Sequence, residues 1–402
     1  MSTPLDPTGL SITVGDVRLT TPGLRGLADV HSPASPGSRA ADDAGQGLLE
    51  GLALGGMEES VTIEISDTAE VDGGGGTRGF ADESAMILDV PTPGESYGQV
   101  VLYKSEDGAF SWHLPESTHA GATRGAAHLR YRIPRAVPEV DPSQSATASR
   151  RLLGAIGNKV LKVLVFPLLD PIVGAVTAHF VARWEAIHRR PRVRALTSGT
   201  LGDDTVDDLS ADGWQLLDGR RILLLIHGTF SRTPGGFGVF WSALDTLAPH
   251  YDAILAFDHP SVSVSPSANI AWLASSLPRG IRVEADVITH SRGGLVGRAL
   301  AERGDDLGIG GRLTVRRLVM VAPPNAGTAL ADVNRIGGYL DRMTTLFLAF
   351  PGPGIADTLA TIVSVVKQIA VAGASALDGL AAMDPSGTPP AEFNTGDRRT
   401  DG

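Results

Sequence analysis

The pattern of apolar and polar positions changes several times along the chain and divides it into segments. Residues 1–57 are rich in glycine, proline, serine and alanine and show little periodicity. Such a segment buries too little apolar area to offset its ordering entropy, so we expect it to be mobile. Residues 58–145 contain runs typical of strands, such as Val61 to Ile65 and Gln99 to Tyr103. These runs predict a small β-rich domain.

Residues 146–195 show the period of a helix instead. One apolar stripe runs from Leu152 to Leu164 and another from Val173 to Ile187, each at the spacing of a helix face. Between them, Asp170-Pro171 is typical of a helix start, with an N-cap residue followed by proline at the first helical position. We therefore expect a helical connector of two helices, which packs against the following domain.

The longest apolar stretch, residues 160–180, has the length of about 20 residues that a membrane span requires. Lys162 and Asp170 interrupt it, and a charge at the centre of a span costs about 2.5–3.5 kcal/mol on insertion scales. We therefore do not expect this stretch to cross a membrane. Peripheral contact with a membrane surface stays open.

From residue 213 to residue 402, strand-like and helix-like segments alternate, which is typical of a parallel sheet with crossover helices. The predicted strands are residues 221–226, 253–257, 284–288 and 317–322. We expect them to be neighbouring and parallel, in the order 253, 221, 284, 317 across the sheet. A polar or glycine-rich cluster follows each strand, at the edge where open α/β sheets bind ligands.

Residues 336–383 are an apolar helical segment within this last domain. Six apolar residues recur there at helical spacing: Ile355, Leu359, Ile362, Val363, Val366 and Ile369. The segment has two interpretations. It is either a cap over a binding site or part of the core.

The sequence Thr289 to Gly294 joins the third predicted strand to a segment with good helix propensity. A serine on such a turn is held in a strained backbone geometry with its hydroxyl above the strand ends, and a glycine two residues later lets the helix approach closely. Ser291 and Gly293 fit this nucleophile elbow, with Thr289 at the position where glycine is usual. In the alternative interpretation, Ser291 is an N-cap residue in an inactive scaffold.

Three motifs in the same order resemble those of lipase-like α/β-hydrolases. They are Ile226 to Phe230, with its His-Gly pair, the elbow from Thr289 to Gly294, and the loop from Pro323 to Thr328. The resemblance covers residues 213–394. It implies the α/β fold class, with an α/β-hydrolase-like, mostly parallel sheet and helices on both faces, preceded by a small β-rich region and a helical linker. It also implies cleavage of a carboxylic ester by acyl transfer to Ser291.

The resemblance assigns the backbone amides of Thr229 and Arg292 as oxyanion donors. Attack on an ester carbonyl creates an oxyanion, and each preorganised donor contributes about 3–4 kcal/mol to its stabilisation. The family's triad runs in the order serine, acid, histidine, but the last histidine of this chain is His290. The acid and the histidine are therefore apparently missing, and no catalytic acid is assigned, although Asp332 and Asp341 follow the fourth strand.

Among the histidines near the elbow, His259 is the candidate substitute base, because it follows a predicted strand at the correct edge. The expected strand order separates it from Ser291 by one strand, which disfavours a direct bond. We expect His290 to pack and His227 to fix a loop.

Composition limits the partners. A formal net charge of −11 argues against binding to a phosphate backbone, so no nucleic acid is expected. The chain has no cysteine, which excludes a thiol nucleophile and disulfides. We identify no cofactor, no metal set and no secretory signal, and we expect a cytoplasmic protein that acts on an ester or acyl small molecule or lipid. The resemblance also implies a sheet that is incomplete at its C-terminal end, and we expect the missing strands in a longer parent chain or a partner.

A second class of function stays open. In it, the chain is a catalytically inactive, hydrolase-like module that binds an acyl ligand or a partner through the same pocket. In a third, the chain is a peripheral membrane or assembly module that uses the predicted helices of residues 149–190.

Overall fold

This computed structural model describes residues 2–31, 43–71, 85–116, 128–134, 158–168, 180–197, 199–200, 206–238, 241–327, 336–351, 354–372 and 383. The chain divides into two compact units. The first comprises residues 1–178, 337–351 and 362–373, and the second comprises residues 179–336, 352–361 and 374–402.

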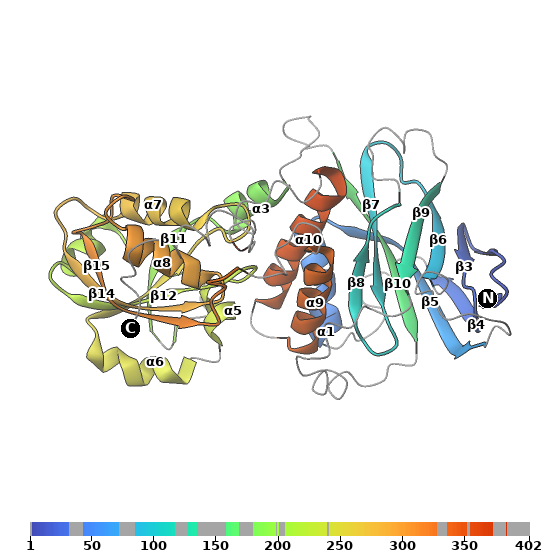
Figure 1. The fold of residues 1–402 in the computed structure, drawn as a ribbon, viewed down its shortest axis with the longest axis horizontal. Coiled ribbons are helices and arrows are strands. Elements are labelled where there is room, and N and C mark those ends of the chain that lie inside the picture. The colour runs from blue at the N-terminus through green and yellow to red at the C-terminus, as the bar shows by residue number, and fades with distance from the viewer. Residues whose placement is uncertain are drawn as a thin grey trace. The chain divides into compact units, whose positions relative to one another are not determined.

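The first unit contains two antiparallel sheets (Figure 1). Its strands are β1 (Thr3–Pro4), β2 (Ile12–Val14), β3 (Val17–Thr20), β4 (Leu24–His31), β5 (Glu58–Glu70), β6 (Ala85–Pro91), β7 (Tyr97–Lys104), β8 (Phe110–His113), β9 (His128–Pro134) and β10 (Lys159–Pro167). One sheet has the order β1-β4-β5-β10-β7-β8 and the other β2-β3-β6-β9. Buried side chains of both sheets, among them Leu19, Ile63, Leu88 and Val101, form one core.

The prediction of a mobile N-terminal segment was wrong for the residues described there. Residues 3–31 form the first four strands, and helix α1 (Asp43–Leu54) follows. These strands are only two to eight residues long and are separated by turns. The alternation of apolar and polar residues within each strand is therefore too short to recognise in the sequence. In the hairpin of β2 and β3, Val14 pairs with Val17 across a two-residue turn, and Gly15 adopts φ +60°. Both valines are buried, so this segment contributes to the core.

The prediction of a helical connector at residues 146–195 was also wrong in its first half. Residues 159–167 form β10, which pairs with β5 on one side and β7 on the other. Of the second stripe, only helix α3 (Phe180–His188) is described, and β11 (Arg192–Leu196) follows it. Asp170-Pro171 lies outside the described residues. No helix among the residues described is long and apolar enough to cross a membrane.

Residues 336–383 contain two apolar helices, α9 (Ile336–Ala349) and α10 (Ile355–Ala372). The prediction that they belong to the last domain was wrong for residues 337–351 and 362–373, which are part of the first unit. The α9 helix covers an edge of the six-stranded sheet. The amides of Phe110 and Trp112 in β8 donate to Thr345 Oγ1 and Asp341 Oδ1, both at 2.8 Å. The Trp112 indole donates to Thr344 Oγ1 at 2.9 Å. These bonds satisfy strand groups that an open edge leaves exposed.

The pH dependence of this contact follows from Asp341. Burial raises its pKa to about 7, against the opposing effects of the Trp112 amide and Arg342. Because the folded pKa lies above the unfolded value of 3.8, folding binds a proton between these two values. The contribution of Asp341 to stability is therefore complete below about pH 4 and is lost as the pH rises through about 7.

We expect Asp341→Asn to stabilise the first unit at pH 8.5 and to change little at pH 5, because asparagine keeps the acceptor for Trp112 without a charge. Hydrogen exchange of a peptide covering β8 measures the difference at both pH values. Equal protection of the variant and the parent at pH 8.5 would contradict this expectation.

The second unit contains one five-stranded sheet with the order β11-β13-β12-β14-β15. Its further elements are α4 (Ala211–Leu216), β12 (Arg221–Ile226), α5 (Thr233–Phe237), α6 (Trp241–Leu247), the 3-10 helix η2 (Ala248–His250), β13 (Ala253–Asp258), α7 (Pro266–Ser276), β14 (Val283–His290), α8 (Gly293–Arg303) and β15 (Leu313–Val321). The strands β13, β12, β14 and β15 are parallel neighbours, and β11 is antiparallel to β13. The predicted order of the four parallel strands is confirmed.

The fold-class prediction for the chain was nevertheless wrong. Among the strands described, ten of fifteen belong to the two antiparallel sheets of the first unit. The chain is therefore β-rich and largely antiparallel, rather than an α/β-hydrolase-like chain with a mostly parallel sheet. The prediction failed because it placed residues 1–57 in no sheet and made a helix of residues 159–167.

Helices cover both faces of the sheet in the second unit (Figure 1). On one face, Phe237 of α5 and Leu244 of α6 pack with Leu223 and Leu225 of β12. On the other face, α8 packs against β12, β14 and β15. Because β12, β13 and β14 are parallel, their carboxyl ends meet at one edge, where the candidate site lies.

Candidate functional site

Ser291 occupies the turn between β14 and α8 and has φ +54°. This left-handed conformation is uncommon for a residue other than glycine; it costs about 1–3 kcal/mol and persists only where the surroundings impose it. The surroundings do so here. The Ser291 amide donates to Val321 O at 2.8 Å, and its carbonyl accepts from Gly294 at 2.9 Å. Within the described residues, no hydrogen bond involves its hydroxyl.

Two glycines allow the chain to pass close to this turn. A Cβ on Gly293 would lie 2.5 Å from the carbonyl oxygens of both Ile226 and His227, so the start of α8 lies against the end of β12. A Cβ on Gly228 would lie 2.8 Å from Ser291 Cβ. The expectation that Gly293 permits close approach of the helix is confirmed, and Gly228 brings the loop after β12 against the serine.

The loop after β12 carries the first proposed oxyanion donor, Thr229. Within the part of the chain that the structure describes, the Thr229 amide has no hydrogen-bond acceptor. The Thr229 hydroxyl donates to the sulfur of Met383 at 3.7 Å. The structure thus places a free amide one residue beyond the glycine that contacts Ser291. Its role as an oxyanion donor stays a prediction.

Arg292, the second proposed donor, begins α8 with a fully buried side chain. Its guanidinium donates to Val264 O and lies 3.4 Å from His259 Nε2. Burial lowers the pKa of Arg292 to about 10, so the group is still charged at neutral pH. The role of the Arg292 amide also stays a prediction.

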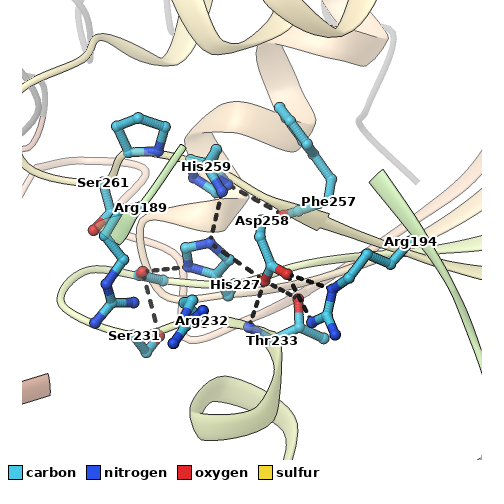
Figure 2. Close-up of polar contacts among 12 residues, drawn as sticks. Arg189, Arg194, His227, Ser231, Arg232, Thr233, Phe257, Asp258, His259 and Ser261 are labelled. Carbon is cyan, nitrogen blue, oxygen red and sulfur yellow. Dashed lines mark hydrogen bonds and ion pairs between the residues drawn. The ribbon is translucent and has the colours of Figure 1, made fainter. Parts of the chain in front are cut away.

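His227 and His259 stack on each other with ring centroids 4.2 Å apart (Figure 2). The His259 amide donates to His227 Nε2 at 3.0 Å, so this nitrogen carries no proton. The proton of His227 is therefore on Nδ1, which donates to Gly228 O at 2.9 Å. Burial lowers the pKa of His227 to about 4 and that of His259 well below 6.5. His227 thus fixes the loop at Gly228.

His259, the candidate substitute base, has other partners at both ring nitrogens. Its Nδ1 lies 3.3 Å from Phe257 O and its Nε2 faces the Arg292 guanidinium. Because a carbonyl only accepts and a guanidinium only donates, Nδ1 carries the proton and Nε2 accepts. Neither nitrogen is bonded to Ser291, and β12 lies between β13 and β14. The structure therefore does not couple His259 to the serine.

The other candidates are His290, Asp332 and Asp341. His290 is half-buried, and its Nδ1 has no partner among the residues described. Asp332 lies outside the described residues. Asp341 belongs to the first unit, where it accepts from Trp112. Among the described residues, no base or acid considered from the sequence is hydrogen-bonded to the Ser291 hydroxyl.

Asp258 is part of a buried ion pair (Figure 2). One oxygen accepts from Arg194 Nε and Nη2 at 3.0 and 2.7 Å, and the other accepts from the amide and hydroxyl of Thr233 at 2.8 and 2.7 Å. Burial acts to raise the pKa of Asp258, but His227, Arg194 and the Thr233 bonds outweigh it and lower the pKa to about 2. Asp258 therefore joins β11 to the start of α5.

Sequence reasoning missed Glu185 of α3 and Arg189, the residue that directly follows α3; they bind the loops after β13 and β12. The Glu185 carboxylate accepts from the amides of residues 261–263. Arg189 Nη2 donates to Phe230 O at 3.1 Å. No sequence signal identified these contacts, because the partners are separated by 41 to 78 residues.

Comparison with known proteins places the chain in a sequence family. The family described as Domain of unknown function (DUF7379) matches residues 189–401, which is more than half of the chain. The chain belongs to this family. The DUF7379 match contains Ser291, Thr229 and Asp258, and it begins at Arg189, so Glu185 precedes it. No curated protein matches the chain.

A solved structure of the CS-b5R domains of human Ncb5or in its NAD+ form is a weak neighbour. It has 10% sequence identity and a TM-score of 0.13, and the match covers 78% of this chain and 74% of that chain. This score is too low to indicate a shared fold. In the part of the chain that the structure describes, no group of three or more His, Cys, Asp or Glu residues could hold a metal ion.

Proposed function

We propose that this chain is a serine ester hydrolase of the lipase or esterase type, with Ser291 as its nucleophile. The observation that carries the proposal is the left-handed Ser291 between β14 and α8, with Gly228 against its Cβ. A serine held in this way presents its hydroxyl at the carboxyl edge of a parallel sheet. Within the described residues the Thr229 amide has no acceptor, and it follows Gly228, the residue that approaches Ser291; both observations support a role for this loop in binding the oxyanion.

The chemistry requires Ser291 Oγ to attack the carbonyl carbon of an ester while the hydroxyl loses its proton. The alcohol then leaves, and water releases the acid from the acyl serine. Among the described residues, no imidazole is bonded to the hydroxyl, so the attacking group is mostly protonated at neutral pH. We therefore expect slow acylation by this chain, with catalysis limited to what the oxyanion amides and substrate binding provide.

The test is reaction with a fluorophosphonate probe and with short p-nitrophenyl esters. We expect slow labelling at a single site, located at Ser291 by mass spectrometry, and its loss in Ser291→Ala. Thr289→Ser is a matched control, because it retains a hydroxyl at the end of β14, two residues before the nucleophile. We expect it to be labelled like the parent.

Labelling at another serine, or undiminished hydrolysis by Ser291→Ala, would contradict the proposal. Absence of labelling in a folded parent would instead favour the second candidate function, a module that binds an acyl ligand without turnover. The missing bond between Ser291 and any described histidine is the observation that keeps this candidate in view.

A further inference from the structure

We propose that Glu185 and Arg189 are positioning residues that hold the loop carrying the Thr229 amide in the geometry needed to bind an oxyanion. This inference rests on the proposed function of Ser291. The two residues lie four positions apart in α3 and its C-terminal extension, so one side of the helix reaches both loops. We call this pair of contacts the α3 clamp.

Glu185 is the first half of the clamp. Its side chain is buried, and its carboxylate accepts four hydrogen bonds, from the amides of Ser261, Val262 and Ser263 at 2.7, 3.0 and 2.8 Å and from the Ser263 hydroxyl at 2.6 Å. Bonds to an ionised acceptor are about twice as strong as neutral ones. Three successive amides that point at one carboxylate fix the path of the loop after β13.

Arg189 is the second half. Its Nη2 donates to Phe230 O, to Asp357 O and to Thr361 Oγ1 at 3.1, 3.2 and 3.0 Å, and it forms an ion pair with the Asp357 carboxylate at 2.6 Å. The guanidinium also lies over the Trp184 ring, 5.3 Å from its centroid. These contacts leave the Arg189 head group little freedom, so it is a fixed donor to Phe230.

Phe230 connects the two halves. Its carbonyl accepts from Arg189, and its amide donates to Ser261 Oγ at 3.1 Å, while the Ser261 amide is bound by Glu185. Phe230 has φ +59°, a conformation that a phenylalanine adopts only when its surroundings impose it. The Thr229 amide belongs to the peptide whose carbonyl is Gly228 O, and this carbonyl accepts from Ser231 Oγ at 3.3 Å and lies 2.9 Å from His227 Nδ1. Phe230 follows directly, so we expect release of either clamp contact to relax the backbone on the other side of Thr229 and to shift its amide.

The first measurement does not depend on activity. In Arg189→Met, we expect the amides of residues 228–231 to exchange with solvent at least about tenfold faster, while β12 and β14 stay protected. Asp357 keeps a cation in this variant, because Arg232 Nε lies 3.3 Å from the same oxygen. Glu185→Gln keeps the shape of the side chain but not its charge. It should speed the exchange of the amides of residues 261–263 and of residues 228–231, the Phe230 loop, together.

The second measurement is the rate of fluorophosphonate labelling. A displaced oxyanion donor should lower the first-order rate constant of phosphonylation by about 10- to 100-fold and leave the affinity for the probe unchanged. Arg189→Lys retains a charged donor, and we expect it to restore part of this rate. Arg190→Met is the matched control, since Arg190 is exposed and pairs with Asp208 at 3.3 Å. It should alter neither quantity.

The outcomes separate the two proposals. Faster exchange of the Phe230 loop in a protein whose parent is never labelled would support the clamp and reject the proposed function. Unchanged exchange in both Arg189→Met and Glu185→Gln would overturn the clamp, whatever the labelling rates. If Arg189→Met does not fold, Arg189→Lys and Glu185→Gln still decide between these results.

Discussion

Gly293→Ala is expected to lower the free energy of unfolding of the second unit by about 3 kcal/mol or more, the upper range for overpacking. The new Cβ would lie 2.5 Å from the carbonyl oxygens of Ile226 and His227. Both oxygens belong to the backbone at the end of β12, which pairs with β13 and β14. A backbone held on both sides cannot move aside without loss of strand pairing, so the helix must move instead.

The matched control is Gly238→Ala in the same unit. Gly238 has φ −56° and ψ −36°, and no atom lies within 4 Å of its added Cβ. A residue other than glycine adopts this conformation without strain, so we expect no loss and a gain of up to about 1 kcal/mol from the unfolded state. Urea denaturation of both variants measures the difference. Equal stability of Gly293→Ala and the parent would show that α8 does not press on β12.

The strands of the second unit could be predicted because buried parallel strands are continuous apolar runs. Residues 221–226 and 253–257 are of this kind, and turn residues follow each of them. Their order followed from the expected topology. The antiparallel neighbour β11 was missed, because it has only five residues, two of them the arginines Arg192 and Arg194, and because the preceding residues are helical.

The same argument explains the error at β10. A strand with partners on both sides, such as Lys159–Pro167, is apolar in most positions, and a short apolar run does not distinguish a buried strand from a buried helix. Leu161, Val163 and Leu164 are all fully buried, so their apolar character reflects burial and does not distinguish a strand from a helix. Residues 159–167 are a strand because they pair with β5 and β7, whose paired residues are at least 56 positions away in the sequence.

The candidate site was predictable to the extent that it is local in sequence. Thr289 to Gly294 determine a strand, a turn and a helix within six residues, and the structure has Ser291 in that turn. The α3 clamp was not predictable, because Glu185 and Ser261 are 76 residues apart and neither belongs to a recognisable motif. The role of Asp258 was also missed, since its partner Arg194 lies in the strand that the sequence did not predict.

Asp258→Asn should be the other strongly destabilising change, because it removes one partner of a buried ion pair. The Arg194 and Asp258 side chains are 0% and 3% exposed. Asparagine keeps the size of the side chain but removes the Asp258 charge that faces the buried guanidinium of Arg194. Loss of one partner of such a pair typically costs about 3–5 kcal/mol. Urea denaturation at pH 7 measures the loss.

An exposed pair on the same sheet provides the control for Asp258→Asn. Glu284 and Arg316 lie 3.2 Å apart on β14 and β15, with side chains 50% and 59% exposed. Water screens this pair, so Glu284→Gln should cost less than about 1 kcal/mol. Arg194→Met combined with Asp258→Asn should recover part of the stability lost by Asp258→Asn alone, because the unpaired charge is then absent. If the double variant is no more stable than Asp258→Asn, the loss arises from the Thr233 bonds and not from the buried charge.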